Sequence, residues 1–331
     1  MAGIILFRNG LPEIFNINDV FKSSGSGQVL VGMAGNRDTT YSLVRKAVEL
    51  AGGMDFINKG DSVLIKPNLN TGDPPPASTN PEVVREVIEM VKEKEPSRIV
   101  VGDKSSFWSD TLSCMKQNGL YDVINETGAE VFPLDDDKWI GVKPKEAANW
   151  KNGFKIPKII KEVDHIISVP VLKTHSIATF SMAIKNWVGI IAQKDRTLDL
   201  HLFNQSEPAF GNMLAEIHLV RKPSFIVTDC TKAFVEEGPS QGKVAEPNIV
   251  YATSDIVAND VTGLSLLKAL GTEDRIQDIS VWEHPQIKRA AELGLGIKRG
   301  GDLKLKYSGI DEIKMIVSGI SDYPMRMLFG W

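Results

Sequence analysis

The sequence is poor in cysteine and in long apolar runs. Its 331 residues include two cysteines, Cys114 and Cys230, which are too few for a disulfide framework or a cysteine-ligated cluster. We therefore expect reduced thiols, a cytoplasmic protein and no iron–sulfur cluster. The opening MAGIILF holds only four consecutive apolar residues without a basic lead-in, so we expect no signal peptide. No later run is long enough to span a membrane.

A surplus of basic residues is also lacking. The net charge is −4, and lysine and arginine gather in no stripe, which argues against nucleic acid as a partner. The composition, 42% hydrophobic and 24% charged, is typical of an ordinary soluble globular protein. The chain is long enough to bury a sizeable core, either as one large unit or as two lobes.

Short β-branched runs alternate with segments of helical period along the chain. This alternation predicts an α/β fold with a mainly parallel sheet flanked by helices. Two helices are expected over residues 39–53 and 81–94, the second with Asn80 as N-cap and Pro81 at its first position. The expected strands lie at residues 27–34, 62–68, 97–103, 130–135, 165–172, 224–229 and 248–255.

The alternation weakens after about Gly271, where charged and glycine-rich pieces follow. We predict an α/β lobe with the cleft over residues 1–205 and a smaller C-terminal lobe or extension over residues 206–331, with one continuous domain as the alternative. The final YPMRMLFGW is unusually apolar. We expect this tail to dock on the protein itself or on a second subunit, which makes a homodimer an option.

Polar residues follow most of the expected strands. In a parallel sheet, ligands bind beyond the carboxyl ends of the strands, so we expect these residues to surround one cleft. An Asp after a strand is explained equally well by a turn or a helix cap, whereas Lys66, inside an apolar strand, needs an anion as partner. The residues concerned are Lys66, Asn68, Asp103, Lys104, Lys173, His175, Asp229 and Asp255.

The stretch from Val169 to His201 holds two of the five histidines and several cations in an otherwise apolar segment. We expect Thr179 to cap a helix that runs to about Gly189 and carries Lys185. The backbone N–H groups at the start of such a helix, with His175 in the preceding loop, would suit a phosphate or a carboxylate. The ordinary alternatives are a solvated helix lysine and two histidines with structural hydrogen bonds.

Together these residues allow several kinds of chemistry. His175 and His201 can ligate a divalent metal or act as acid and base near pH 7, while Lys185 can neutralise a cofactor or hold it covalently. We therefore predict these three as catalytic residues. The predicted metal ligands are His175, His201, Asp229 and Asp255. The predicted cofactor-binding residues are Lys66, Asn68, Asp103, Lys104, Lys173 and Arg196.

A series of motifs resembles that of the family known as domain of unknown function 362, in the same order and over roughly Leu64 to Leu267. Many members of that family carry a cysteine-rich, ferredoxin-like segment or an export signal, and this sequence has neither. The motifs are LIKPNLN, STNPEVV, VVGDKSS, VPVLKTH, AIKNWVG, DRTLDLH, EEGPSQG and SDIVANDVTG.

A second resemblance rests on three residues. Nine residues separate His175 from Lys185, and fifteen separate Lys185 from His201. This spacing is similar to that of the nickel-dependent lactate racemase family. The resemblance implies a lysine that carries a covalently attached nickel-pincer nucleotide, and histidines that ligate nickel or take the substrate proton. The racemase segment before the lysine is rich in glycine and bears an arginine, whereas here Lys185 follows SMAI.

Two functional hypotheses follow. The leading one is an enzyme that acts on a small anionic molecule, a carboxylate or a phosphate, with a metal or nucleotide-like cofactor and isomerase or oxidoreductase chemistry. The alternative is a non-catalytic protein that binds or carries a phosphorylated cofactor in the same cleft.

Overall fold

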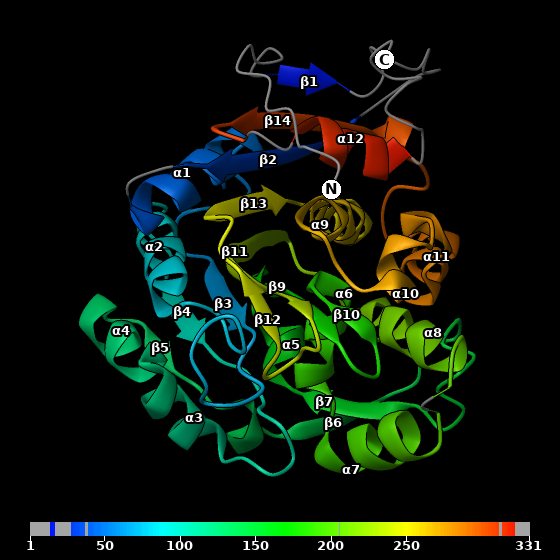
Figure 1. Ribbon diagram of the computed structural model, residues 1–331. Coiled ribbons are helices and arrows are strands. Elements are labelled where there is room, and N and C mark those ends of the chain that lie inside the picture. The colour runs from blue at the N-terminus through cyan, green and yellow to red at the C-terminus, as the bar shows by residue number, and fades with distance from the viewer. Residues whose placement is uncertain (1–13, 17–27, 37–38, 205, 311–312, 322–331) are drawn as a thin grey trace.

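Figure 1 shows a computed structural model of the chain. The structure describes residues 14–16, 28–36, 39–204, 206–310 and 313–321. The apolar tail, residues 323–331, lies outside these residues, so its docking stays a prediction. Among the described helices, none has the length and apolar character that a membrane crossing requires.

The described residues contain one sheet of twelve strands and a separate two-stranded hairpin. The strands are β1 Ile14–Asn16, β2 Val29–Gly35, β3 Ser62–Pro67, β4 Arg98–Val101, β5 Glu130–Val131, β6 Trp139–Val142, β7 Phe154–Pro157, β8 His165–Val169, β9 Val171–His175, β10 Thr179–Ser181, β11 Phe225–Glu236, β12 Lys243–Ala245, β13 Ile249–Thr253 and β14 Leu303–Ser308.

The main sheet has the order β1-β14-β2-β13-β11-β8-β3-β4-β5. The run from β11 to β5 is parallel throughout, and β14 is parallel to β2. Only β1 and β13 oppose their neighbours along this path. Strands β9, β10 and β12 branch from β11, and β6 pairs with β7 in the separate hairpin. The predicted α/β fold with a mainly parallel sheet is therefore confirmed.

Helices cover both faces of the sheet, as Figure 1 shows. The α-helices are α1 Thr40–Leu50, α2 Pro81–Lys92, α3 Thr111–Asn118, α4 Leu120–Thr127, α5 Ile159–Glu162, α6 Ala183–Asn186, α7 Gln193–Asp195, α8 Ala209–Glu216, α9 Ile256–Leu270, α10 Asp274–Gln277, α11 Pro285–Glu292 and α12 Ile313–Ser321. The other helical segments are η2 Leu134–Asp136, η3 Trp187–Ile190, η4 Arg196–Leu202, η5 Ile217–Leu219, η6 Val281–Glu283 and η7 Gly300–Asp302.

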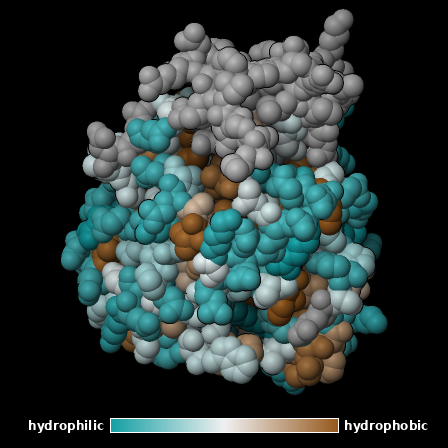
Figure 2. All heavy atoms as spheres, in the orientation of Figure 1, coloured by the Kyte–Doolittle hydropathy of each residue, from teal (hydrophilic) through white to brown (hydrophobic). Residues whose placement is uncertain are grey.

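Successive side chains of a strand point to opposite faces of the sheet, and β3 shows the effect. Val63 and Ile65 join the core formed with α1 and α2, while Leu64 between them joins the core on the other face, which contains residues of α8, α9 and α11. A strand that is apolar on both sides is thus covered on both sides. The face seen in Figure 2 is mainly hydrophilic outside the grey atoms, with hydrophobic residues in small groups.

Strand β13 does not run as the sequence led us to expect. It is antiparallel to both β11 and β2, so its carboxyl end lies at the opposite edge of the sheet from those of β3, β4 and β8. The prediction that Asp255 joins the other strand-end residues around one cleft is therefore wrong. Instead, Asp255 caps α9 by accepting the N–H groups of Val257 and Ala258 at 2.9 and 2.8 Å.

The expected helix from Thr179 to Gly189 is also wrong in its first part. Thr179 begins β10, which pairs back on β9 as an antiparallel hairpin, and its φ of 66° is left-handed. The helix begins only at Ala183, and η3 follows directly after it. Thr179 and Phe180 favour a strand as readily as a helix, and a run this short has no decisive period.

The C-terminal part of the chain returns to the sheet. Strand β14, within a stretch that we read as a charged extension, pairs with β2 along its whole length. Its residues alternate between buried and half-buried at first, as a strand of the sheet requires. Strands from both sides of residue 205 pair in the same sheet. The proposed boundary between two lobes at this residue stays a prediction.

Replacing Asn80 by Ala should lower the free energy of unfolding by about 1 kcal/mol. The side chain of Asn80 accepts the N–H of Glu82 at 3.0 Å at the start of α2, as the sequence predicted, and the variant removes that acceptor. Urea unfolding measures the change. Asn80→Ser keeps a capping oxygen and should retain most of the stability, so an equal loss in both variants would contradict a capping role.

Candidate functional site

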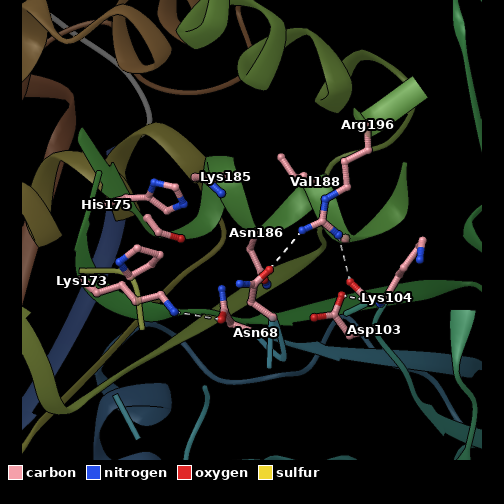
Figure 3. A pocket seen from close by; sticks show the side chains of 13 residues that line it. Asn68, Asp103, Lys104, Lys173, His175, Lys185, Asn186, Val188 and Arg196 are labelled. Atoms are coloured by element: carbon pink, nitrogen blue, oxygen red, sulfur yellow. Dashed lines mark hydrogen bonds between the residues drawn. The ribbon is translucent and has the colours of Figure 1, made fainter. Parts of the chain in front are cut away.

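A cavity lies near the carboxyl ends of β3 and β4, where they meet β9, α6 and η4 (Figure 3). Its volume is about 30 Å³, which is room for roughly two water molecules. Nearly all of its wall residues are polar or charged. They are Asn68, Asn70, Asp103, Lys104, Lys173, His175, Ser181, Lys185, Asn186, Val188, Gly189, Arg196 and Pro239.

Lys66 and Asp103 form a buried ion pair beside the cavity. Lys66 Nζ lies 2.6 Å from Asp103 Oδ1, and the two side chains are 0% and 4% exposed. Asp103 also accepts the backbone N–H groups of Leu69 and Lys104, each at 2.8 Å. Burial lowers the pKa of Lys66, whereas the charge of Asp103 raises it. The anionic partner that we expected for Lys66 is thus the carboxylate of Asp103.

Gly189, in η3, packs directly on this pair. A Cβ at this position would lie 2.1 Å from Asp103 Oδ1 and 2.7 Å from Lys66 Nζ. Both contacts are too short for any side chain. The absence of a side chain therefore lets the backbone after α6 approach the ion pair.

Arg196 enters the cavity from η4 on the opposite wall. It is 6% exposed, and it donates to the carbonyl of Ser105 at 2.9 Å and to Asn70 Oδ1 at 3.1 Å. Its Nε is buried and has no partner among the described residues. The neighbouring Lys104 is paired with Asp135 at 2.6 Å. Arg196 is therefore held by neutral oxygens alone and keeps one donor unused.

Lys173, in β9, extends toward Asn68 (Figure 3). Its ammonium donates to Asn68 Oδ1 at 3.3 Å and to the carbonyl of Ala77. Burial lowers its pKa to about 7, against the charges of Asp103 and Asp73. The cavity thus holds a lysine that loses its proton easily when no anion is nearby.

The contacts of His175 define its tautomer. Its Nδ1 accepts the N–H groups of Ile177 and Ala178, both at 3.2 Å, so the neutral ring carries its proton on Nε2. Burial, followed by the charges of Lys185 and Lys173, keeps the pKa of His175 well below its ordinary value. His175 therefore offers the cavity a hydrogen-bond donor rather than a free lone pair.

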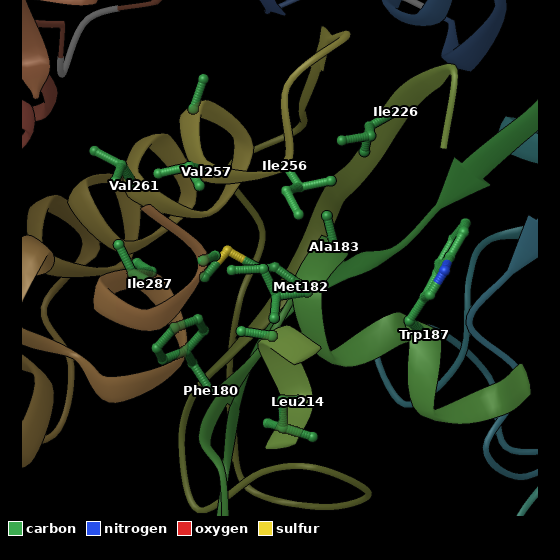
Figure 4. Packing of buried hydrophobic residues seen from close by; sticks show 14 of the residues in the cluster. Phe180, Met182, Ala183, Trp187, Leu214, Ile226, Ile256, Val257, Val261 and Ile287 are labelled. Carbon is green, nitrogen blue, oxygen red and sulfur yellow. The ribbon is translucent and has the colours of Figure 1, made fainter. Parts of the chain in front are cut away.

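Lys185 lies in the short helix α6, which is held firmly in the core (Figure 4). The carboxylate of Asp260 accepts the N–H groups of Ala183 and Ile184 at 2.9 and 3.2 Å. The carbonyl of Ile184 is hydrogen-bonded to His218 Nε2 at 3.0 Å. The N–H groups that we expected to bind an anion are thus taken by Asp260, and the site depends on side chains.

The amine of Lys185 has no hydrogen-bond or ion-pair partner among the residues that the structure describes. It is half-buried in the cavity wall, and no acceptor or carboxylate within the described ranges bonds to it. Burial, then the charges of Arg196, Lys173 and Lys66, lowers its pKa to about 7. Near neutral pH a large fraction of this side chain is therefore the uncharged amine.

His201 lies near this group but does not line the cavity. It follows Arg196 by five residues in η4, which is a π-helix, and its ring centroid lies 5.6 Å from that of Phe210. Burial and the charges of Lys185 and Arg196 lower its pKa to about 3. The charge of Lys185 thus acts on both His175 and His201, although His201 does not line the cavity.

The predicted metal ligands are not gathered. Asp229 accepts the N–H groups of Asn80 and Thr231 at 2.8 and 3.0 Å, and Asp255 caps α9 at the other sheet edge. Across the described part of the chain, no three His, Cys, Asp or Glu side chains are grouped so that they could hold a metal ion.

Sequence reasoning missed several wall residues: Asn70, Ser181, Asn186, Val188, Gly189 and Pro239. Most of them lie inside the motifs quoted above. The motifs therefore indicated these positions, although the chemistry of each residue alone did not. Pro239 comes from EEGPSQG, a loop that is fixed over β9 because Gly238 N–H donates to Thr174 Oγ1 at 2.9 Å.

The family model described as Domain of unknown function (DUF362) matches residues 63–265. The chain belongs to this family, which confirms the resemblance found in the motifs. The sequence is 28% identical over 228 residues to a protein named Thylakoid-associated protein sll1697, from a Synechocystis strain, and the match covers 68% of this chain and 69% of that protein.

The fold also resembles the lactate racemase apoprotein from Thermoanaerobacterium thermosaccharolyticum. The TM-score is 0.43 at 15% sequence identity, and the match covers 69% of this chain. The chain spans about half of that protein, 54% of its length.

The ligand-free protein should become more stable as the pH rises from about 7 to about 9. Because Lys173 and Lys185 have pKa values of about 7 when folded, below those of unfolded lysine, the unfolded chain binds more protons in this range. Each lysine should contribute about 2 kcal/mol of the rise. Urea unfolding against pH measures it.

Lys173→Met and Lys185→Met should each remove the contribution of one lysine to the rise in stability. Other titrating groups affect all three proteins alike, so their effects cancel in the comparison with the unmodified protein. Parallel pH profiles for all three proteins would contradict the lowered pKa values.

Proposed function

We propose that this protein is an enzyme that binds a small anionic molecule, a carboxylate or a phosphate, in the cavity and acts on it with the amine of Lys185. The observation that carries the proposal is the position of Lys185: half-buried, without a bonding partner in the described chain, and surrounded by donors. An enclosed amine of this kind serves as a nucleophile or a base.

The other wall residues support binding of the anionic group. His175 presents Nε2–H, and Arg196 keeps a buried Nε without a partner. Hydrogen bonds from such groups to an anion are stronger than those to a neutral acceptor. The single wall carboxylate, Asp103, is paired with Lys66 and does not oppose an incoming negative charge.

The uncharged amine explains why Lys185 is suited to chemistry. With a pKa of about 7, roughly half of it is neutral at pH 7, about a thousandfold more than for an exposed lysine. A neutral amine can take a proton from the carbon beside the anionic group or add to a carbonyl carbon. We therefore propose isomerase chemistry, with oxidoreductase chemistry as the second class.

The residues do not fit a metal-dependent version of this proposal. A metal would need a ring nitrogen with a free lone pair, but the Nδ1 of His175 is used by two backbone N–H groups, and its Nε2 carries the proton. No step therefore passes through nickel or a nickel-pincer nucleotide.

A cytoplasmic location remains part of the proposal. Cys114 and Cys230 are both free and buried, which is usual for proteins of a reducing compartment. The name of the Synechocystis relative makes a thylakoid surface the competing location.

Glyoxylate, a small anionic aldehyde, should label Lys185 ahead of the exposed lysines at pH 7. The amine adds to the aldehyde carbon, water leaves, and borohydride reduces the resulting imine to a stable secondary amine. Peptide mapping by mass spectrometry locates the product. We expect labelling at Lys185 to exceed that at Lys59, whose side chain is 80% exposed, by at least about tenfold, and to be suppressed by added inorganic phosphate.

Lys185→Arg keeps a positive charge and removes the reactive amine, so it should still bind anions but lose the label. Equal labelling of Lys185 and Lys59 would overturn the role of the amine. Anion binding without preferential labelling would instead favour the non-catalytic binding or carrier protein.

A further inference from the structure

Two carboxylates at the cavity are paired with lysines, and the charge of a third, Asp73, acts on Lys173. Asp103 is paired with Lys66 and Asp135 with Lys104, both at 2.6 Å. In each pair one positive charge faces one negative charge, so the two pairs add little net charge to the field in the cavity.

Two further basic side chains, Arg196 and Lys173, border the same cavity without a carboxylate partner in the described chain, while Lys185 provides the uncharged amine proposed to react. Arg196 and Lys173 are 6% and 1% exposed, so solvent screens their charges poorly. Their hydrogen bonds go to Asn70, Ser105, Asn68 and Ala77. These acceptors are neutral oxygens, which orient a cation without cancelling its charge.

We infer that the ligand of this cavity is a dianion whose two negative charges lie on one compact tetrahedral group, as in a phosphate monoester. The inference rests on the proposed anion binding and specifies its charge. A single negative charge would leave either Arg196 or protonated Lys173 uncompensated. A small cavity requires the charges to be close together, and the bulk of a larger ligand would have to extend out of it.

The unused donors suit the oxygens of such a group. Arg196 Nε is buried and unpartnered, His175 Nε2 carries a proton, and the hydroxyl of Ser181 lines the same wall. A tetrahedral oxyanion has several acceptor oxygens pointing in different directions, whereas a carboxylate has two in one plane.

Binding of a dianion should also draw a proton into the site. The charges of Arg196, Lys173 and Lys66 disfavour protonation of Lys185. Lys173 feels Asp103 and Asp73 as opposing charges. A dianion bound against Arg196 and Lys173 adds to the effect of these carboxylates, so Lys173 takes up a proton as the dianion binds, whereas the proposed reaction requires the amine of Lys185 to stay uncharged.

Sulfate and methanesulfonate provide a matched test, because both are tetrahedral and they differ by one charge. Calorimetry on the full-length protein at pH 8 should show sulfate binding about tenfold or more tightly than methanesulfonate. Repeating the sulfate titration in buffers of different ionisation enthalpy should show uptake of about one proton.

The variants separate the site from general charge effects. Lys173→Met should abolish the proton uptake and weaken sulfate more than methanesulfonate. Lys194→Met, which removes an exposed lysine near the site, should change neither. Glycerol 3-phosphate binding at least as tightly as inorganic phosphate would support the monoester. Binding of inorganic phosphate alone would overturn the monoester.

Equal affinities for sulfate and methanesulfonate would overturn the dianion and leave the proposed function standing. Failure of both anions to bind, with glyoxylate labelling of Lys185 retained, would also overturn the dianion and leave the proposed function standing. Failure of both anions together with no preferential labelling would overturn the proposed function itself.

Discussion

The ion pair between Lys66 and Asp103 fixes the position of most of the site. Asp103 ties the segment after β4 to the segment after β3 through the N–H of Leu69, and Lys66 reaches Asn186 at the end of α6. Gly189 then closes on both charges. Taking two charges out of water is costly, and removing one partner of such a pair typically costs about 3–5 kcal/mol. The pair is therefore a structural centre around which the unpaired cations are arranged.

Much of the fold was predictable because its signals are local. Repeated apolar runs define strands that are covered on both faces, and Asn80 with Pro81 marks the start of α2. The direction of β13 was not predictable, because the strands of an antiparallel pair have the same composition as parallel ones. Strand β14 was not recognised in the sequence because its alternating lysines resemble a solvated segment. The residues between these lysines are buried, and the strand pairs in parallel with β2.

The residues that form the site were more predictable from the sequence than the chemical role of each residue. Lys173, His175, Lys185 and Arg196 do gather at one cavity, although they come from β9, α6 and η4. Their protonation depends on tertiary contacts that no spacing reveals. The N–H groups of Ile177 and Ala178 make His175 a donor. The carboxylate of Asp260, about seventy-five residues further along, occupies the helix N-terminus that the sequence offered to a ligand.

The π-helical form of η4 sets the angle between the side chains of that segment. Its hydrogen bonds reach back five residues, as from Phe203 N–H to the carbonyl of Leu198 at 3.0 Å, so residues five apart, such as Arg196 and His201, lie on the same side of the helix. In an α-helix, at 3.6 residues per turn, the same two side chains would diverge by about 140°. This segment is consequently more sensitive to insertions and deletions than to substitutions. Loss of a single residue would change the phase of His201 relative to Arg196, whereas an exchange at an exposed position such as Leu202 would leave that phase unchanged.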